Sequence, residues 1–228
     1  PNFPSFREGV ALGPFLEAKF GIPVFINNDG DLFAYGEALG GALPEVNARL
    51  EALNSPKRYK NLVGYTFGTG LGVGIVVDNQ LNRGDNSCVE TFCLKHKKMP
   101  EIIVEDGASI RAVKRVYGEL TGNPDHGLEP KDICEIADGT REGNAEAARK
   151  AFAEMGEIAG DAMATAVTLI DGLIVIGGVA STTVAAPIKF VFTAGEMTVS
   201  IQEILNKIMP TLVPMLVTVG CWLLADKK

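Results

Sequence analysis

A glycine-rich turn between two strand-like runs is the part of this sequence best suited to chemistry. Within residues 62–77, every second position from 68 to 74 is glycine, and Thr69 lies in the turn. Glycine lets a ligand approach the main chain closely, and successive N–H groups in such a turn can surround an anion. The β-branched run that follows predicts a strand, whereas a dinucleotide fingerprint or a P-loop requires a helix. We therefore expect a β-hairpin that either binds a phosphate or is simply rich in glycine.

A carboxylate follows another strand-like run nearer the start of the chain. Residues 23–27 predict a buried strand, and Asn28 and Asp29 stand between it and a helical pattern over 32–39. Open α/β sheets bind ligands at the carboxyl ends of their strands. Asp29 can accept a proton from a substrate hydroxyl, and Asn28 can hydrogen-bond to a sugar. The alternative is that Asp29 or Asp31 only caps the helix.

The elements that would position these groups alternate between helix and strand, which indicates the α/β class. Asn144 is expected to cap a long helix, and the pattern over 89–104 is ambiguous. Further helices are expected at 14–20, 45–53, 109–120, 131–137 and 144–170, and a buried strand at 173–176.

Composition narrows the class of protein. The chain has 228 residues, 46% of them hydrophobic, and a formal net charge of −7. Duplex nucleic-acid binders carry a basic face, and the short run 95–98 is interpreted as a solvated loop, so no nucleic-acid partner is expected. The four cysteines show no disulfide framework, which indicates a reducing, cytoplasmic location. Residues 208–224 carry no charge and approach the length of a membrane span, but we favour a buried terminal helix over membrane contact.

Taken in order, the motifs of residues 1–178 resemble those of the ROK family of bacterial sugar kinases and sugar-responsive repressors. Residues 20–29 match the family's run into its catalytic Asn-Asp pair, and residues 68–76 match its second phosphate motif. Residues 105–109 match the motif that follows the family's zinc motif, and residues 171–178 match its third phosphate motif, near the adenosine.

The resemblance implies an actin-like, ribonuclease-H-like ATPase lobe with a mixed sheet and flanking helices. It also implies ATP-dependent phosphorylation of a hexose or hexosamine, with Mg²⁺, in a homodimer. Asp29 would be the general base. The implied sugar-binding residues are Asn28, Glu90 and Glu105, and those implied for ATP are Gly68, Thr69, Gly70, Gly72, Gly177 and Gly178.

Three departures from the family pattern qualify this prediction. Cys93 replaces the expected zinc-ligand histidine, and Cys88 and His96 bring the candidate ligands to three where structural zinc needs four. We therefore predict no metal site and place His96 at the surface or the substrate edge. The family's opening phosphate loop is also absent, so we expect little turnover from this chain alone, which would be the lobe of a longer kinase.

The third departure follows Gly178, where residues 179–228 form a divergent hydrophobic tail. Within it, 199–216 resembles the IID membrane component of mannose-class sugar phosphotransferase systems. A sugar kinase is the leading hypothesis. The alternatives are a sugar-sensing transcriptional regulator without catalysis and, from the tail, a membrane transport subunit.

Overall fold

A four-stranded mixed sheet forms the centre of the computed structural model, which describes residues 9, 11–86, 89–177, 191–194 and 197–200. The strand order is β3-β2-β1-β4, with β1 antiparallel to β2 and parallel to β4. The predicted hairpin and the predicted α/β class are thus confirmed. The strands of this sheet are β1 (Leu62–Phe67), β2 (Leu71–Val77), β3 (Gln80–Leu81) and β4 (Leu173–Gly177), and β5 (Val191–Ala194) and β6 (Met197–Ser200) pair separately.

The described residues contain seven helices, and each expected helix is present within a few residues of its predicted bounds. Asn144 caps the long helix by accepting a hydrogen bond from the N–H of Ala147 at 3.0 Å, as predicted. The helices are α1 (Leu12–Phe20), α2 (Asp29–Gly40), α3 (Ala42–Ala52), α4 (Val104–Gly107), α5 (Ile110–Thr121), α6 (Pro130–Asp138) and α7 (Ala145–Ile170).

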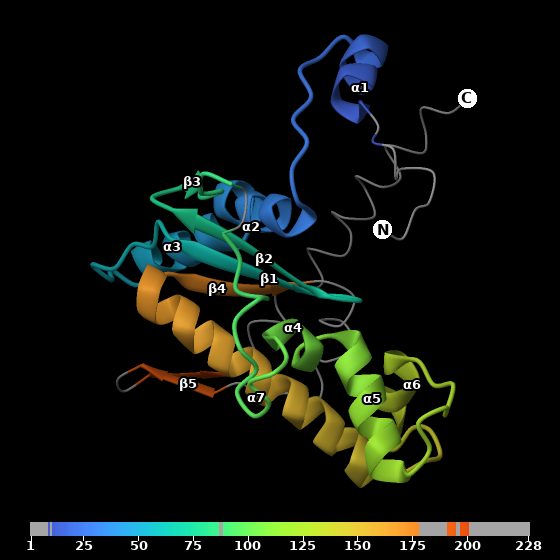
Figure 1. Ribbon diagram of the computed structural model, residues 1–228. Helices are drawn as coiled ribbons and strands as arrows, with labels where there is room; N and C mark the ends of the chain where they lie inside the picture. The colour runs from blue at the N-terminus through green and yellow to red at the C-terminus, as the bar shows by residue number, and fades with distance from the viewer. Residues whose placement is uncertain (1–8, 10, 87–88, 178–190, 195–196, 201–228) are drawn as a thin grey trace.

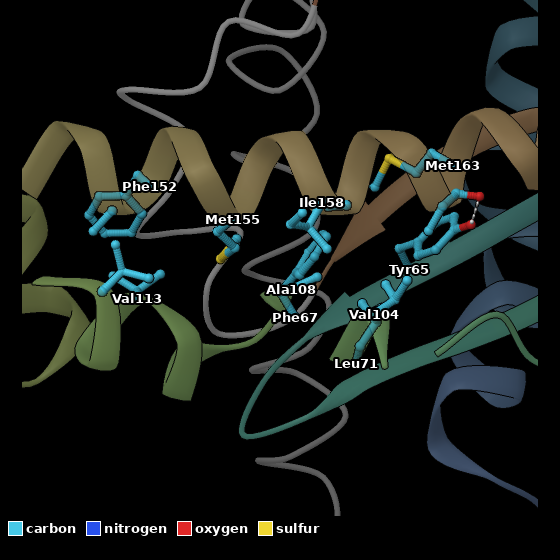
Figure 2. Close-up of a cluster of buried hydrophobic side chains, with 14 of the residues drawn as sticks. Tyr65, Phe67, Leu71, Val104, Ala108, Val113, Phe152, Met155, Ile158 and Met163 are labelled. Carbon is cyan, nitrogen blue, oxygen red and sulfur yellow. Dashed lines mark hydrogen bonds between the residues drawn. The ribbon is translucent and has the colours of Figure 1, made fainter. Parts of the chain in front are cut away.

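The helices cover both faces of the sheet (Figure 1). Helix α2 packs on β1 and β2 from one side and is continued by α3, while α7 crosses the other face with α5 and α6 beside it. Alternating side chains of β1 explain the two layers, because successive residues of a strand point to opposite faces. Tyr65 and Phe67 join the core under α7 (Figure 2). Val63 belongs to the same core cluster, whereas Leu62 packs with Ala34 of α2.

Helix α2 approaches the hairpin closely because glycine occupies the contact positions. A β-carbon on Gly64 would lie 2.8 Å from the β-carbon of Ala34, and one on Gly74 would lie 2.5 Å from the carbonyl oxygen of Gly30. No side chain fits at such separations. Two of the glycines in the glycine-rich run therefore serve helix packing rather than ligand approach.

The prediction of a buried strand at residues 23–27 is wrong. This segment forms no strand in the structure, and Phe25 is 88% exposed. It connects α1 to α2, and α1 stands away from the sheet with no buried residue (Figure 1). An apolar run predicts burial only when another element covers it, and none of the described residues does so here.

Truncation of Phe25 checks this correction. Phe25→Ala is expected to change the free energy of unfolding by less than about 0.5 kcal/mol, because the ring is exposed. Phe152→Ala is the matched control: that ring is 1% exposed in the core under α7, and its loss should cost about 3–5 kcal/mol. Urea denaturation of both variants measures the two values. A cost of several kcal/mol at Phe25 would mean that the segment is covered after all.

Part of the predicted tail lies outside the described residues. This holds for Gly178, for most of 179–228 and for the apolar run 208–224. Among the helices that the structure does describe, none combines the length and the apolar character needed to cross a membrane.

Candidate functional site

The start of helix α2 lies against the hairpin. The Asn28 side chain caps the helix, with Oδ1 accepting hydrogen bonds from the N–H groups of Gly30 at 2.8 Å and Asp31 at 3.4 Å. A β-carbon on Gly30 would lie only 3.0 Å from the backbone nitrogen of Val73. Asp29, one residue before this contact, is exposed at the helix start. The carboxylate and the hairpin that the sequence singled out therefore lie side by side.

The loop 68–70 that joins β1 to β2 is held by backbone hydrogen bonds. The N–H of Gly68 donates to the carbonyl of Gly70 at 3.0 Å, and the N–H of Ile110, at the start of α5, donates to the carbonyl of Gly68 at 3.0 Å. Within the described part of the chain, the N–H groups of Thr69 and Gly70 have no partner. These two donors and the hydroxyl of the exposed Thr69 lie on consecutive residues of one turn, an arrangement suited to an anion.

Glu105, from α4, lies directly against this loop. Its Oε2 accepts a hydrogen bond from the N–H of Leu71 at 3.0 Å, and its Oε1 pairs with the guanidinium of Arg111 at 3.0 Å. A β-carbon on Gly70 would lie 2.5 Å from Oε2, so a larger residue at that position would displace the Glu105 carboxylate. The carboxylate thus fixes the exit of the loop while remaining partly accessible.

Carboxylates gather between these elements. Burial raises the pKa of Glu90, and the charges of Asp31, Asp29 and Glu105 raise it further, in that order of size. Burial also raises the pKa of Asp31, and the positive charge of Arg83 opposes that rise. Four acidic side chains from three separate segments therefore share one region.

This crowding makes stability depend on pH in a defined direction. Because the pKa of Glu90 is raised in the folded state, its ionisation destabilises the fold as pH rises above the ordinary value of 4.5. Glu90→Gln is therefore expected to gain stability relative to the unmodified protein between pH 4 and pH 7. Urea midpoints at both pH values measure the gain. Glu51→Gln, on the exposed side of α3, is the control, and an equal gain there would contradict the prediction.

Gly177 reaches the same edge of the sheet. It ends β4 and pairs with Thr66 near the end of the parallel strand β1, so both strands point toward the loop 68–70. A β-carbon on Gly177 would lie 2.6 Å from the ring of Phe33, which shows a packing requirement that the sequence did not reveal. Similarly, a β-carbon on Gly72 would meet the Thr66 hydroxyl.

The expectation that His96 lies at the surface or the substrate edge is wrong, because its ring is only 2% exposed. Its Nδ1 accepts hydrogen bonds from the N–H groups of Lys98 and Met99 at 3.2 and 3.1 Å, which turns the ring inward beneath Gly107. Cys93 is exposed, and Cys88 lies outside the described residues. In the described ranges, no three His, Cys, Asp or Glu side chains are grouped closely enough to hold a metal.

Two residues of this region were missed from the sequence, namely Asp31 and Arg111. Asp31 was considered only as a helix cap, and Arg111 follows Glu105 by six residues without any recognisable pattern.

A separate open cavity of about 530 Å³ lies near the opposite ends of β1 and β4, lined by Lys57, Arg58, Tyr59, Lys60, Asn61, Asp78 and Asp171.

The mixed sheet with helices on both faces is the actin-like ATPase fold. A solved glucokinase structure from Parabacteroides distasonis matches with a TM-score of 0.74 and 50% identity, covering 88% of this chain and 66% of that one. A ROK glucokinase from Streptomyces griseus, solved with glucose and AMPPNP, matches with a TM-score of 0.56 and 26% identity over 78% of this chain and 60% of that one. Residues 2–91 match the model of the ROK family. The predicted resemblance to the ROK family is thus confirmed.

Curated relatives include both enzymes and regulators. A xylose repressor from Bacillus spizizenii is 33% identical over 75 residues, which are 33% of this chain and 16% of the repressor. A glucokinase from Streptomyces coelicolor is 37% identical over 70 residues, which are 30% of this chain and 18% of that enzyme. The matched stretches thus span less than a fifth of these relatives. Residues 147–228 match a second model, the IID component of the mannose/fructose/sorbose phosphotransferase family, which also fits the predicted resemblance of the tail.

Proposed function

We propose that this protein, or a longer kinase that contains this lobe, transfers the γ-phosphoryl group of ATP to a hydroxyl of a hexose or hexosamine. The contact between the start of α2 and the hairpin carries the proposal. In this contact Gly30, the residue after Asp29, lies against Gly72 and Val73 of β2, the strand that follows a loop whose N–H groups suit a phosphate. Phosphoryl transfer depends mainly on positioning and charge neutralisation, so these parts suffice in principle.

Asp29 would accept the proton of the sugar hydroxyl as the hydroxyl oxygen attacks the γ-phosphorus. The bond from that phosphorus to the bridging oxygen breaks, and ADP leaves with the electron pair. Asn28 caps α2 through its Oδ1, which leaves the Nδ2 group to donate to a sugar hydroxyl. Glu90 and Glu105 would accept hydrogen bonds from further sugar hydroxyls.

The loop would hold the phosphates of ATP. Gly68, Thr69, Gly70 and Gly72 surround the turn, and Gly177 and Gly178 would leave room for the nucleotide at the end of β4. Mg²⁺ is proposed to arrive with the nucleotide, where it neutralises phosphate charge. We also keep the predictions that the protein is a cytoplasmic homodimer and that residues 1–178 and 179–228 form a kinase lobe and a separate tail.

A coupled ADP-release assay with a panel of hexoses and N-acylated hexosamines tests the function. Sugar-dependent ADP release, with a sugar phosphate as the second product, would support the kinase. ADP release that does not respond to any sugar would oppose it.

A sugar-sensing regulator is the second candidate, favoured by the similarity to xylose repressors. Such a protein would bind a sugar without ADP release. Calorimetric titration with the same sugars separates the two functions, because only the kinase pairs binding with turnover. A transport subunit would rest on the IID match alone, most of which lies outside the described residues.

A further inference from the structure

His96 is a buried imidazole to which the proposed kinase function gives no role. The residue is 2% exposed, and its Nδ1 accepts hydrogen bonds from the N–H groups of Lys98 at 3.2 Å and Met99 at 3.1 Å. Because these two groups donate, Nδ1 carries no hydrogen, and the neutral ring carries its hydrogen on Nε2. Among the residues that the structure describes, Nε2 has no hydrogen-bond partner.

Core packing alone does not explain an imidazole at this position. A buried N–H group without an acceptor costs about 1–3 kcal/mol, and an apolar side chain of similar size would avoid that cost. An apolar side chain could not, however, accept the two N–H groups of the turn that follows. The role of His96 therefore lies in the segment that Nδ1 orders.

That segment is the end of a loop that leads back to Glu105. An antiparallel bridge joins Lys95 to Ile103, so the loop doubles back just beyond His96. Because Glu105 belongs to the returning side, disorder at the turn reaches it through a continuous ladder. The backbone hydrogen bonds of this ladder run from His96 to Ile102 at 3.0 Å, from Val104 to Leu94 at 2.8 Å and from Glu105 to Phe92 at 3.1 Å.

The ring also lies directly beneath α4, the helix that carries Glu105. A β-carbon on Gly107 would meet Nε2 of His96, and it would lie 2.5 Å from Cδ2 of the ring and 3.0 Å from Cγ2 of Ile158 on α7. Glu105 in turn accepts a hydrogen bond from the N–H of Leu71 at 3.0 Å, where β2 leaves the proposed phosphate loop. A continuous set of contacts thus joins the buried ring to that loop.

Salt bridges on the outside of the turn do not replace this link. Lys98 pairs with Glu157 of α7 at 2.7 Å, and Lys97 lies 3.7 Å from Asp161. These four side chains are between 42% and 47% exposed, and exposed pairs contribute only about 0–1 kcal/mol. The Nδ1 acceptor is therefore the stronger constraint on the turn.

We propose that His96 is a positioning residue: through Nδ1 it orders the turn 96–99 and thereby holds Glu105 against the exit of the loop 68–70. The effect on the loop follows from these contacts, whereas the effect on sugar binding rests on the proposed function. Because the ring is buried, His96 acts through Glu105 and touches no substrate itself.

Amide hydrogen exchange at Leu71, followed by NMR in the full chain without ligand, tests this role, because that N–H reports on Glu105. His96→Leu removes the acceptor and should speed exchange at Leu71 about tenfold, as expected for the loss of one hydrogen bond. His96→Asn places Oδ1 as many bonds from Cα as Nδ1 and should keep exchange within a few-fold. The N–H of Ile110, which donates to Gly68, is the internal reference and should not change.

His126→Leu is the matched control. Nδ1 of His126 accepts the N–H of Leu128 at 2.9 Å, so this substitution removes the same kind of turn hydrogen bond beside α5. Exchange at Leu71 should stay the same in that variant.

Three results would overturn the role of His96. The first is unchanged exchange at Leu71 in His96→Leu, and the second is equal acceleration at Leu71 in His96→Asn or at Ile110. A second variant, His96→Phe, keeps an aromatic ring without the acceptor. Loss of the whole fold in both apolar variants is the third, because the ring would then support the entire domain rather than Glu105.

Calorimetric titration of the full chain with glucose connects this contact to the proposed function. His96→Leu should weaken glucose binding about three- to tenfold, the contribution of one hydrogen bond, and His96→Asn should restore it. Unchanged glucose affinity in His96→Leu, together with faster exchange at Leu71, would overturn the effect on sugar binding. Failure of the unmodified chain to bind glucose would instead oppose the sugar site, and exchange at Leu71 would still decide the role of His96.

Discussion

Replacing Asp29 with Asn is expected to reduce sugar phosphorylation at least about a hundredfold while leaving sugar affinity within a few-fold of its original value. General-base catalysis contributes roughly 10²–10⁴ to rate, and an amide cannot accept the hydroxyl proton. The amide can still accept a hydrogen bond from the N–H of Gly30, as Asp29 Oδ1 does at 2.9 Å, so the helix start should be preserved. The kcat from coupled ADP release and the Kd from calorimetry measure the two effects separately.

Asp78→Asn is the control for this substitution. Asp78 is an exposed aspartate that pairs with Lys60 beside the opposite end of the sheet, at φ 52°, a conformation that Asn also tolerates. The Asp78→Asn substitution removes an identical charge without touching the proposed site, so kcat should stay the same. Undiminished turnover in Asp29→Asn would exclude Asp29 as the base. An equal loss in both variants would mean that charge, not proton transfer, limits the rate.

The sequence predicted a helix or strand well where residues that begin and end such an element stood at both ends of its hydrophobic pattern. The long helix α7 was predicted from Asn144 to about residue 170, because a capping residue begins it and Asp171-Gly172 ends it. The strand at 23–27 failed for a different reason. Its apolar residues indicate what a strand would bury, but burial depends on a covering element that local sequence cannot reveal.

The sequence predicted which residues belong to the candidate site better than it predicted which residues contact one another. The sequence assigned Asp29, the loop 68–70 and Glu105 to one candidate site. In the structure, the start of α2, which carries Asp29, and the Glu105 side chain both contact the hairpin that contains the loop. It could not distinguish glycines that form the loop from those on which α2 packs, since both occur at every second position. His96 was misplaced because its neighbours Lys95, Lys97 and Lys98 are charged, whereas two backbone N–H groups hold its ring inward.

The packing of α2 on the hairpin yields the second large prediction. Gly74→Ala is expected to destabilise the fold by about 3 kcal/mol, since the added methyl would meet the Gly30 carbonyl at 2.5 Å and the Ala34 β-carbon at 2.6 Å. Gly36→Ala, on the exposed side of the same helix, meets no atom within 4 Å. It should stabilise the protein by about 0.5–1 kcal/mol, because alanine favours helix. Urea denaturation gives both values.

A double substitution shows whether the destabilisation arises at the proposed contact. Ala34→Gly removes one of the three obstructing atoms, which also include the Gly30 carbonyl oxygen and the Asp31 Cα, so Gly74→Ala should cost less in that background, with a coupling of at least about 0.5 kcal/mol. Independent, additive effects would place the strain elsewhere. If Gly74→Ala alone proved harmless, α2 would not pack on β2 as described. Asp29 would then lose its position beside the loop, and the kinase proposal would lose the contact on which it depends.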